Sequence, residues 1–345
     1  MKQVADRAGV AVSSVSRVLN GHPDVSAVMR NRVLDSVAAL GYEPDLLAQS
    51  LRKGATMTVG YLVGDISNPL LAEIVLGAEL HLREAGYSSL LTNSVNDPGQ
   101  DVDHLRLLQQ RRVDGVLLSL TDEDDPALLS ALDRVSVPTV LVDRRAAGRG
   151  LAAVLSDHAY GIRAAVAHVA DLGHQRIALV NGNPRVRPSR ERAAALRSSC
   201  RARGVTPTVR SAAFSPQHGE AATLELMQVD EAPTVIIAGS NQILVGVLRA
   251  LRTLGLSVPH DVSLITCDDV ALSEFLQPAI ATISRDPHEI GRIGAELLLE
   301  QLRGEAPRQQ LLPTGFRPTG SCARPPTGQR APRAPHVVDD RTEPS

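Results

Sequence analysis

Polar side chains gather where strongly apolar runs end in this chain. Each run has the length of a buried strand, and residues that are charged or can hydrogen-bond follow it directly. The carboxyl ends of parallel strands are where open α/β sheets bind ligands, so these positions predict a small-molecule site. The polar positions are 65–68, 119–122, Asp143, 181–183, 240–242, Asp268 and Asp269.

A second set of such side chains lies near the N-terminus, on a short helix predicted to begin at Val12. Its outward face carries small, hydrogen-bonding and cationic side chains, which suit a DNA major groove and its phosphates. A merely solvated helix face looks the same, and these residues alone do not separate the two interpretations. The residues of this face are Val12, Ser13, Ser14, Ser16, Arg17 and Asn20.

Other chemistries lack their motifs. The chain has no GxxxxGK[ST] or GxGxxG phosphate loop and no GxSxG elbow for a serine hydrolase. His158, His168 and His174 form neither an HExxH motif nor a tight cluster, so we expect structural roles for them and no metal site. The three cysteines are widely spaced and include no CxxC pair, which argues against a disulfide framework. No cofactor is expected.

The long middle part of the chain, from Thr58 to about Arg317, alternates strand-like runs with amphipathic stretches. Continuously apolar strands separated by helices indicate parallel sheets that are covered on both faces. Roughly 260 residues is more than one such sheet needs, so we expect two βαβ lobes that meet near residue 155, with a cleft between their strand ends. The runs are TVGYLVG, SSLLTNS, DGVLLSL, PTVLVD, RIALVNG, TVIIAGS and VSLITCDD.

The first 41 residues predict a helix-turn-helix unit. Two short helices, 4–8 and 12–19, are joined through Gly9, and Ser26 can cap a third helix that ends at Gly41. The third helix buries the first two through an apolar stripe made of Met29, Val33, Val37 and Leu40.

The overall composition excludes several classes of protein. With 345 residues, of which 43% are hydrophobic, the chain is long enough for two or three domains and is not disordered as a whole. The formal net charge of -2 excludes a polycationic protein. No apolar run reaches about 18 residues and no apolar signal core is present, so we expect no membrane span and a cytoplasmic protein.

Several motifs together resemble the lactose-repressor (LacI/GalR) family of transcription regulators. VADRAGVAVSSVSRVLNG is followed by VS and then RVLDSVAALGYEPDLLAQSLRKG, and the likeness continues to about residue 320. The later motifs are DISNP, RRVDGVLL, LGHQRIALV, the R-x-R at 190–192, VPHDVSLITCDD and PAIATI. The resemblance implies an α/β protein: a three-helix headpiece plus a two-lobed, parallel-sheet sensor like periplasmic sugar-binding proteins.

The domain boundaries follow from this resemblance. We expect a DNA-binding headpiece at 1–41, a hinge helix and linker at 42–56, and a disordered tail at 321–345. The first sensor subdomain comprises 57–155 and 284–312, and the second comprises 156–283 and 313–320.

The resemblance also assigns DNA contacts. Positions that match Val12 and Ser13 read base edges in the family, and those that match Ser14, Ser16, Arg17 and Asn20 position the helix, mostly on phosphates. In the hinge, Leu51 matches an apolar wedge that enters the minor groove. Ala48 is small enough to let two paired hinge helices approach closely. Ala11 stands where a Ser or Thr usually caps the recognition helix.

The effector positions of the family fall on strand-end residues. Arg192 matches an arginine that holds ligand oxygens, Asp268 an acid that accepts from hydroxyls, and Phe214 an aromatic that packs on the ligand face. Asn241 stands where an Asp is common. The other matching positions are Leu70, Leu71, Asp143 and Ser240, with Ser119, Thr121 and Arg285 as weaker candidates. This chemistry fits a sugar or a related polyol.

The function predicted from the sequence is a ligand-responsive repressor and not an enzyme. A homodimer binds a pseudo-palindromic double-stranded DNA operator in the nucleoid, under allosteric control by a small-molecule effector. A solute-binding protein of a transport system is the alternative, but the headpiece and the missing signal core argue against it. A sugar hydrolase is a third class, but the adjacent Asp268 and Asp269 are poorly placed to act as paired catalytic acids.

Overall fold

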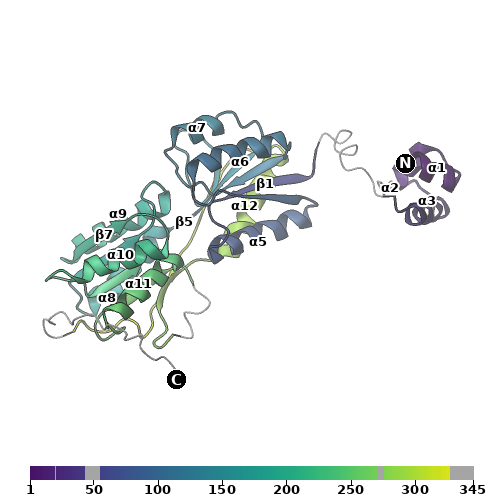
Figure 1. Cartoon of the computed structure of the whole chain (residues 1–345). Coiled ribbons are helices and arrows are strands. Elements are labelled where there is room, and N and C mark those ends of the chain that lie inside the picture. The colour runs from purple at the N-terminus through teal and green to yellow at the C-terminus, as the bar shows by residue number, and fades with distance from the viewer. Residues whose placement is uncertain (20, 43–54, 270–275, 327–345) are drawn as a thin grey trace, which may run out of the picture. The chain divides into compact units, whose positions relative to one another are not determined.

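The computed structural model describes residues 1–19, 21–42, 55–269 and 276–326. The chain divides into two compact units, Met1–Met57 and Thr58–Ser345 (Figure 1). Within the described residues, no helix has the length and apolar character needed to cross a membrane.

The first unit contains three helices, α1 (Lys2–Ala8), α2 (Val12–Leu19) and α3 (Ala27–Leu40). Gly9 has a left-handed φ of 61°, which lets the chain turn directly from α1 towards α2. The Ser26 hydroxyl accepts a hydrogen bond from the Met29 amide and caps α3, as the sequence predicted. The last turn differs from expectation, because Leu40 is exposed. The buried core is made of Val4, Ala5, Ala8, Val15, Val18 and Val33.

The second unit consists of two lobes, each built on a six-stranded sheet. The first sheet has the strand order β11-β5-β4-β3-β1-β2, and all its pairs are parallel. The elements of this lobe are β1 (Thr58–Val63), α5 (Pro69–Glu84), β2 (Ser88–Asn93), α6 (Pro98–Gln110), β3 (Gly115–Leu118), α7 (Pro126–Leu132), β4 (Thr139–Val142), β5 (Ala152–Ser156), α12 (Pro287–Leu302) and β11 (Gln309–Leu312).

The second lobe repeats this design with the strand order β12-β10-β9-β8-β6-β7. Its edge strand β12 runs antiparallel to β10, so this sheet is not purely parallel. The elements are α8 (His158–Asp171), β6 (Arg176–Asn181), α9 (Arg187–Ala202), β7 (Thr206–Ser211), α10 (Pro216–Met227), β8 (Val235–Ala238), α11 (Asn241–Thr253), β9 (Ser263–Cys267), β10 (Ala281–Ser284) and β12 (Gly315–Arg317).

Alternate residues of each central strand pack on opposite helical layers. In β1, Tyr61 lies in the core under α5 and α12, whereas Leu62 lies in the core under α6 and α7. In β6, Leu179 packs with α8 and α9, whereas Val180 packs with α10 and α11. Because both faces are covered, these strands read as unbroken apolar runs in the sequence.

All seven strand-like runs predicted from the sequence form strands. Five further strands are present among the described residues: β5, β7, β10, β11 and β12. Three of these, β7, β11 and β12, are sheet edges with partly exposed residues, so their sequences are less apolar. The other two, β5 and β10, lie inside their sheets, and alanine makes up part of each, so their sequences are less strongly apolar than the predicted runs.

The chain crosses between the lobes three times, between β5 and α8, between β10 and α12, and between β11 and β12. After β12 the chain stays on the second lobe. The Ser321 hydroxyl donates to the Leu264 carbonyl and accepts from the Ala281 amide, and His174 Nε2 lies 2.7 Å from the Ala323 carbonyl oxygen. Residues 321–323 therefore differ from the expected tail, because these hydrogen bonds fasten them to the sheet. Residues 327–345 lie outside the described part of the chain.

Paired glycines let two helices approach backbone to backbone in each lobe. A Cβ added at Gly291 of α12 would lie 2.0 Å from the Ile74 carbonyl oxygen of α5, and one at Gly77 would lie 2.3 Å from the His288 carbonyl oxygen. In the second lobe, α10 and α11 make the same contact through Gly219 and Gly246.

We therefore predict that Gly291→Ala lowers the free energy of unfolding by about 1–3 kcal/mol, because the added methyl group forces α5 and α12 apart. Gly294→Ala in the same helix is the matched control, since its Cβ would meet the nearest atom, Val154 Cγ1, at an ordinary 3.4 Å. That change removes a helical glycine and should stabilise by up to about 1 kcal/mol. Urea denaturation of both variants measures the difference, and equal effects would contradict the close-packing argument.

Candidate ligand cleft and nucleic-acid interface

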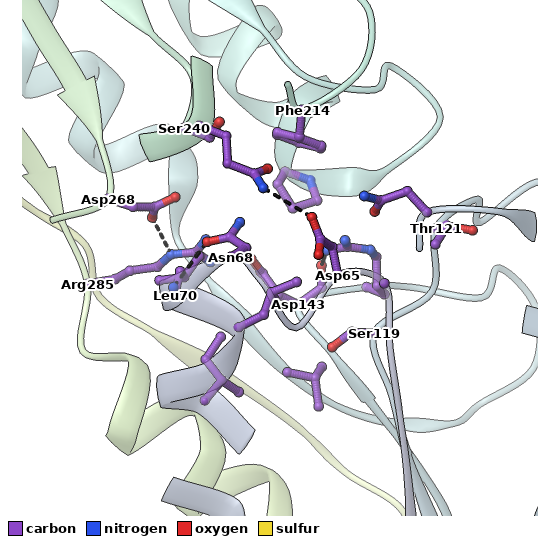
Figure 2. A pocket seen from close by; sticks show the side chains of 18 of the residues that line it. Asp65, Asn68, Leu70, Ser119, Thr121, Asp143, Phe214, Ser240, Asp268 and Arg285 are labelled. Atoms are coloured by element: carbon purple, nitrogen blue, oxygen red, sulfur yellow. Dashed lines mark hydrogen bonds and ion pairs between the residues drawn. The ribbon is translucent and has the colours of Figure 1, made fainter. Parts of the chain in front are cut away.

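A cavity of about 60 Å³ lies between the two lobes of the second unit (Figure 2). The first lobe contributes residues that follow β1, β2, β3 and β4, together with the end of β4 and the first two turns of α5. The second lobe contributes α9 and residues that follow β7, β8 and β9. Arg285 enters from the connection between β10 and α12. The cavity thus lies at the strand ends where the sequence predicted a ligand site.

Nine of the ten predicted effector residues line this cavity: Leu70, Leu71, Thr121, Asp143, Arg192, Phe214, Ser240, Asp268 and Arg285. The tenth, Asn241, is buried beside it, and its Nδ2 donates to Asn68 Oδ1 at 2.9 Å. Their roles as ligand contacts stay predictions. Three further polar lining residues, Asp65, Asn68 and Gln242, lie in the strand-end stretches that the sequence predicted, whereas the sequence did not single out Asn96 and Arg144.

Arg285 joins one aspartate from each lobe. Its Nε donates to Asp268 Oδ1 at 2.7 Å, and its Nη1 donates to Asp143 Oδ2 (Figure 2). Arg192 donates to the Gly239 carbonyl at 2.7 Å and lies 3.8 Å from Asp268 Oδ2. The side chains of Arg285, Asp143 and Asp268 are only 7%, 5% and 4% exposed, so their charges are compensated by one another and not by water.

Both aspartates have a left-handed backbone, with φ of 53° at Asp143 and 71° at Asp268. This region is uncommon for residues other than glycine, although Asp tolerates it better than most, and such residues cluster at functional sites. Asp143 does not cap a helix, although it directly follows a strand. Its oxygens accept from the Ser156 amide and from Arg187 and Arg285. Ser240 does cap α11, by accepting from the Ile243 amide.

Two buried residues that sequence reasoning did not assign to the site complete a charge network around Asp143. His158 Nε2 lies 2.9 Å from Asp143 Oδ2, and Arg187 Nη1 donates to Asp143 Oδ1 at 3.0 Å. His158 begins α8, directly after the connection from β5, and Arg187 begins α9. No local motif marks either residue, because only the crossing of the chain between the lobes brings them to Asp143. We call Asp143, His158, Arg187, Arg192, Asp268 and Arg285 the interlobe charge network.

The network shifts the ionisation of its members. Burial alone would raise the pKa of Asp143, but His158, Arg285 and Arg187 hold it well below its usual range. Burial lowers the pKa of His158 to about 4 despite the neighbouring Asp143, and the charges of Arg192 and Arg285 act in the same direction. His158 is therefore neutral at pH 7 and donates its Nε2 proton to Asp143.

Elsewhere in the cavity the lobes are joined by a hydrogen bond from a neutral amide to a carboxylate, and an aromatic ring lines the wall. Gln242 Nε2 donates to Asp65 Oδ2 at 3.1 Å (Figure 2). Phe214 supplies an aromatic ring, and Gly182 makes room for it, since a Cβ there would lie 2.0 Å from Phe214 Cε1. The cavity thus offers charged groups on one side and an apolar ring face on the other.

The first unit presents a polar helix face of the predicted kind. Val12 is 45% exposed, Ser13 and Arg17 are exposed, and Ser14 and Ser16 are half-buried, whereas Val15 and Val18 of the same helix face the core. Asn20, Ala48 and Leu51, which the sequence assigned to DNA contacts, lie outside the described residues.

Comparison with known proteins agrees with both units. Residues 1–45 match the family of bacterial regulatory proteins of the lacI family, and residues 166–322 match a periplasmic binding protein-like domain. The ribose operon repressor of Escherichia coli (strain K12) is 31% identical over 315 residues, which is 90% of this chain and 96% of that protein.

Two solved structures extend the comparison. The lac repressor dimer bound to operator and the anti-inducer ONPF aligns with a TM-score of 0.83 at 26% identity, covering 93% of this chain and 98% of that one. A LacI family regulator from Enterococcus faecium with bound ribose aligns with a TM-score of 0.69 at 28% identity, covering 77% and 99%.

The depressed pKa of His158 predicts a loss of stability on mild acidification. Between pH 6.5 and about 4, the unfolded chain binds a proton at this residue that the folded chain does not bind. The free energy of unfolding therefore decreases by roughly 2–4 kcal/mol as the pH is lowered from 6.5 to about 4. Ionised Asp143 also stabilises the folded protein, and this stabilisation is fully present between pH 6.5 and 4. It is lost only at lower pH, as the pH falls through the lowered pKa that Asp143 has in the folded protein. His158→Gln keeps a donor for Asp143 and should flatten the profile between pH 6.5 and 4. The exposed His260→Gln is the control. Denaturant midpoints measured across this range test it, and equal slopes in all three proteins would contradict it.

Proposed function

Because the chain belongs to the LacI family of bacterial regulatory proteins, we propose that it is a repressor whose DNA binding responds to a small uncharged sugar. The observation that carries the proposal is the presence, in one chain, of an exposed recognition-type helix face and a buried polar cavity between two lobes. A solute-binding protein would need the cavity but not the helix-turn-helix unit.

The DNA-binding role rests on the outward face of α2. Val12 and Ser13 are exposed at its first turn, where recognition helices contact base edges, and Arg17 is exposed one turn further for phosphate contact. A homodimer would place two such helices in successive major grooves of a pseudo-palindromic operator, about one helical turn apart. Ala48 and Leu51 would belong to the hinge that contacts the minor groove between them.

The charge balance of the cavity favours a ligand without net charge. Three aspartates and three arginines line it, and they offset one another. Arg285 is held by Asp143 and Asp268, and Arg144 donates to two backbone carbonyls. Carboxylate and guanidinium groups then serve as hydrogen-bonding partners for hydroxyls, while Phe214 packs on a ring face.

The size of the cavity favours one sugar ring over two. About 60 Å³ holds a few water molecules, so any ligand must displace side chains or part the lobes, and a small one requires less movement. D-ribose is therefore the first ligand to test, because a ribose operon repressor and a ribose-bound regulator are among the proteins similar to this chain.

For DNA binding, we expect fluorescence anisotropy to show tight, sequence-dependent binding to a duplex from the DNA upstream of the protein's own gene. Affinity should fall with rising salt, and a single half-site should bind more weakly than the full site. Arg17→Ala should weaken binding about tenfold and reduce the salt dependence, because it removes a cationic contact. Arg106→Ala on α6, which removes a similarly exposed charge outside the first unit, is the control. Equal binding to all duplexes would contradict a sequence-specific repressor.

For the effector, we expect isothermal titration calorimetry to show binding of D-ribose, and D-ribose to change the affinity for the operator. Arg192→Gln should weaken ribose binding at least about tenfold, because it removes a charged hydrogen-bond donor from the cavity. Arg197→Gln, an exposed change on the same helix, should have no effect. Ribose 5-phosphate and cellobiose should bind more weakly than ribose. Tighter binding of the phosphate would overturn the argument from charge balance.

A further inference from the structure

The loop that follows β3 in the first lobe is fastened to the start of α9 in the second. The Asn183 amide Nδ2 donates to the Thr121 carbonyl at 2.9 Å, and the Glu123 amide donates to the Arg185 carbonyl at 3.2 Å. Arg185 also forms an ion pair with Asp122. Backbone and side chains of both lobes therefore take part in the contact between residues 121–124 and 183–190.

Glu123 lies at the centre of this contact, and its side chain is only 1% exposed. One carboxylate oxygen, Oε1, accepts from the backbone amide of Arg187 at 2.9 Å, and the other, Oε2, accepts from the Arg190 side chain. Arg187 is the first residue of α9, so the carboxylate occupies the position of a helix cap. A negative charge at this end of a helix is further stabilised by the helix dipole.

α9 lacks a cap of its own. Its N-cap residue is Val186, which has no polar side chain and makes no capping hydrogen bond. The other seven described helices of this unit are each capped by their own N-cap side chain, an Asn, an Asp or a Ser. The cap of α9 is instead supplied by Glu123 of the opposite lobe.

We propose that Glu123 is a positioning residue that caps α9 across the cleft, so that the N-terminal turn of α9 is ordered only when the lobes are closed. The turn carries Arg187, which holds Asp143, and one turn later the helix carries Arg192, which lines the cavity. Closure of the cleft then also places Arg192 in the cavity. The cap itself is independent of the ligand, and its consequence for binding rests on the proposed function.

The small cavity gives this arrangement a role in ligand entry. A sugar needs more room than about 60 Å³, so side chains must move or the lobes must part to admit one. Parting the lobes exposes Glu123 to water and leaves the Arg187 amide without its acceptor. Closure restores both. The cross-lobe cap therefore opposes opening in the free protein and opposes release once a ligand is inside.

Hydrogen exchange of the full chain without ligand tests the cap directly. In Glu123→Ala we expect the Arg187 amide and the amides of 121–124 to exchange at least about tenfold faster, because a buried charged acceptor is lost. Glu123→Gln should restore part of the protection, since its carbonyl oxygen still accepts. Asp103→Asn, which alters an exposed acid on α6 of the same lobe, is the control and should leave exchange unchanged. Unchanged exchange in Glu123→Ala would overturn the proposal.

A second variant keeps the test meaningful if Glu123→Ala folds poorly. Arg190 is 44% exposed, so Arg190→Gln removes one partner of Glu123 without touching the core. We expect faster exchange of the Arg187 amide, by less than in Glu123→Ala. No change at this amide would contradict a coupled cap.

Stopped-flow kinetics with D-ribose test the consequence for binding. Both the association and the dissociation rate should rise at least about fivefold in Glu123→Ala, because the barrier to parting the lobes is lower. A residue that only stabilised the fold would reduce the fraction of active protein and leave both rates unchanged, which would overturn the positioning role. If ribose does not bind even the unaltered protein, the proposed effector is wrong, and hydrogen exchange alone decides the cap.

Discussion

The need to compensate buried charge at the junction of the two lobes governs the rest of the sensor unit. An isolated charge removed from water is strongly unfavourable, and each member of the interlobe charge network is tolerated because the others surround it. Arg285 is the clearest case, since it stands on a crossing connection and holds an aspartate from each lobe. The lobes are therefore coupled by electrostatics as well as by three chain crossings. Replacing either aspartate removes a partner of Arg285 and so affects the contacts of both lobes.

The sheets place these charges with little freedom. β4 and β9 lie inside their sheets, with both faces covered, so the residues at their carboxyl ends start from fixed positions. The left-handed backbone at Asp143 and Asp268 then turns the chain immediately after each strand. Behind the site, the glycine pairs lock α5 to α12 and α10 to α11 at backbone contact, which makes each lobe a stiff body. Stiff lobes confine motion to their junction, where the cavity and the cross-lobe cap lie.

Local sequence patterns predicted most of the strands, but they did not reveal the residues whose roles depend on contacts between distant segments. Six of the seven predicted runs are interior strands, because burial on both faces leaves a clear apolar composition, whereas the edges β7, β11 and β12 leave none. The seventh run, β2, is an edge strand that was predicted although it is partly exposed. Arg192 and Asp268 were predicted because a family resemblance marks their positions. His158, Arg187 and Glu123 have no such marker. Each matters through a partner 15, 44 or 64 residues away, and only the crossing of the chain between the lobes brings those partners together. Asn241 was predicted from its family position alone, and the hydrogen bond from its side chain to Asn68 could not be foreseen from the sequence.

The interleaved route of the chain also affects how the protein is made. The first lobe begins at β1 but needs α12 and β11, and the second begins at α8 but is closed by β12 and by residues 321–323. During synthesis, which proceeds from the N-terminus, neither sensor lobe has all its strands until nearly the whole described chain has left the ribosome. The helix-turn-helix unit, in contrast, has its full core once Val33 has emerged. Each nascent molecule thus carries a complete helix-turn-helix unit long before its lobes are complete, and premature termination before β11 leaves both lobes without their last strand.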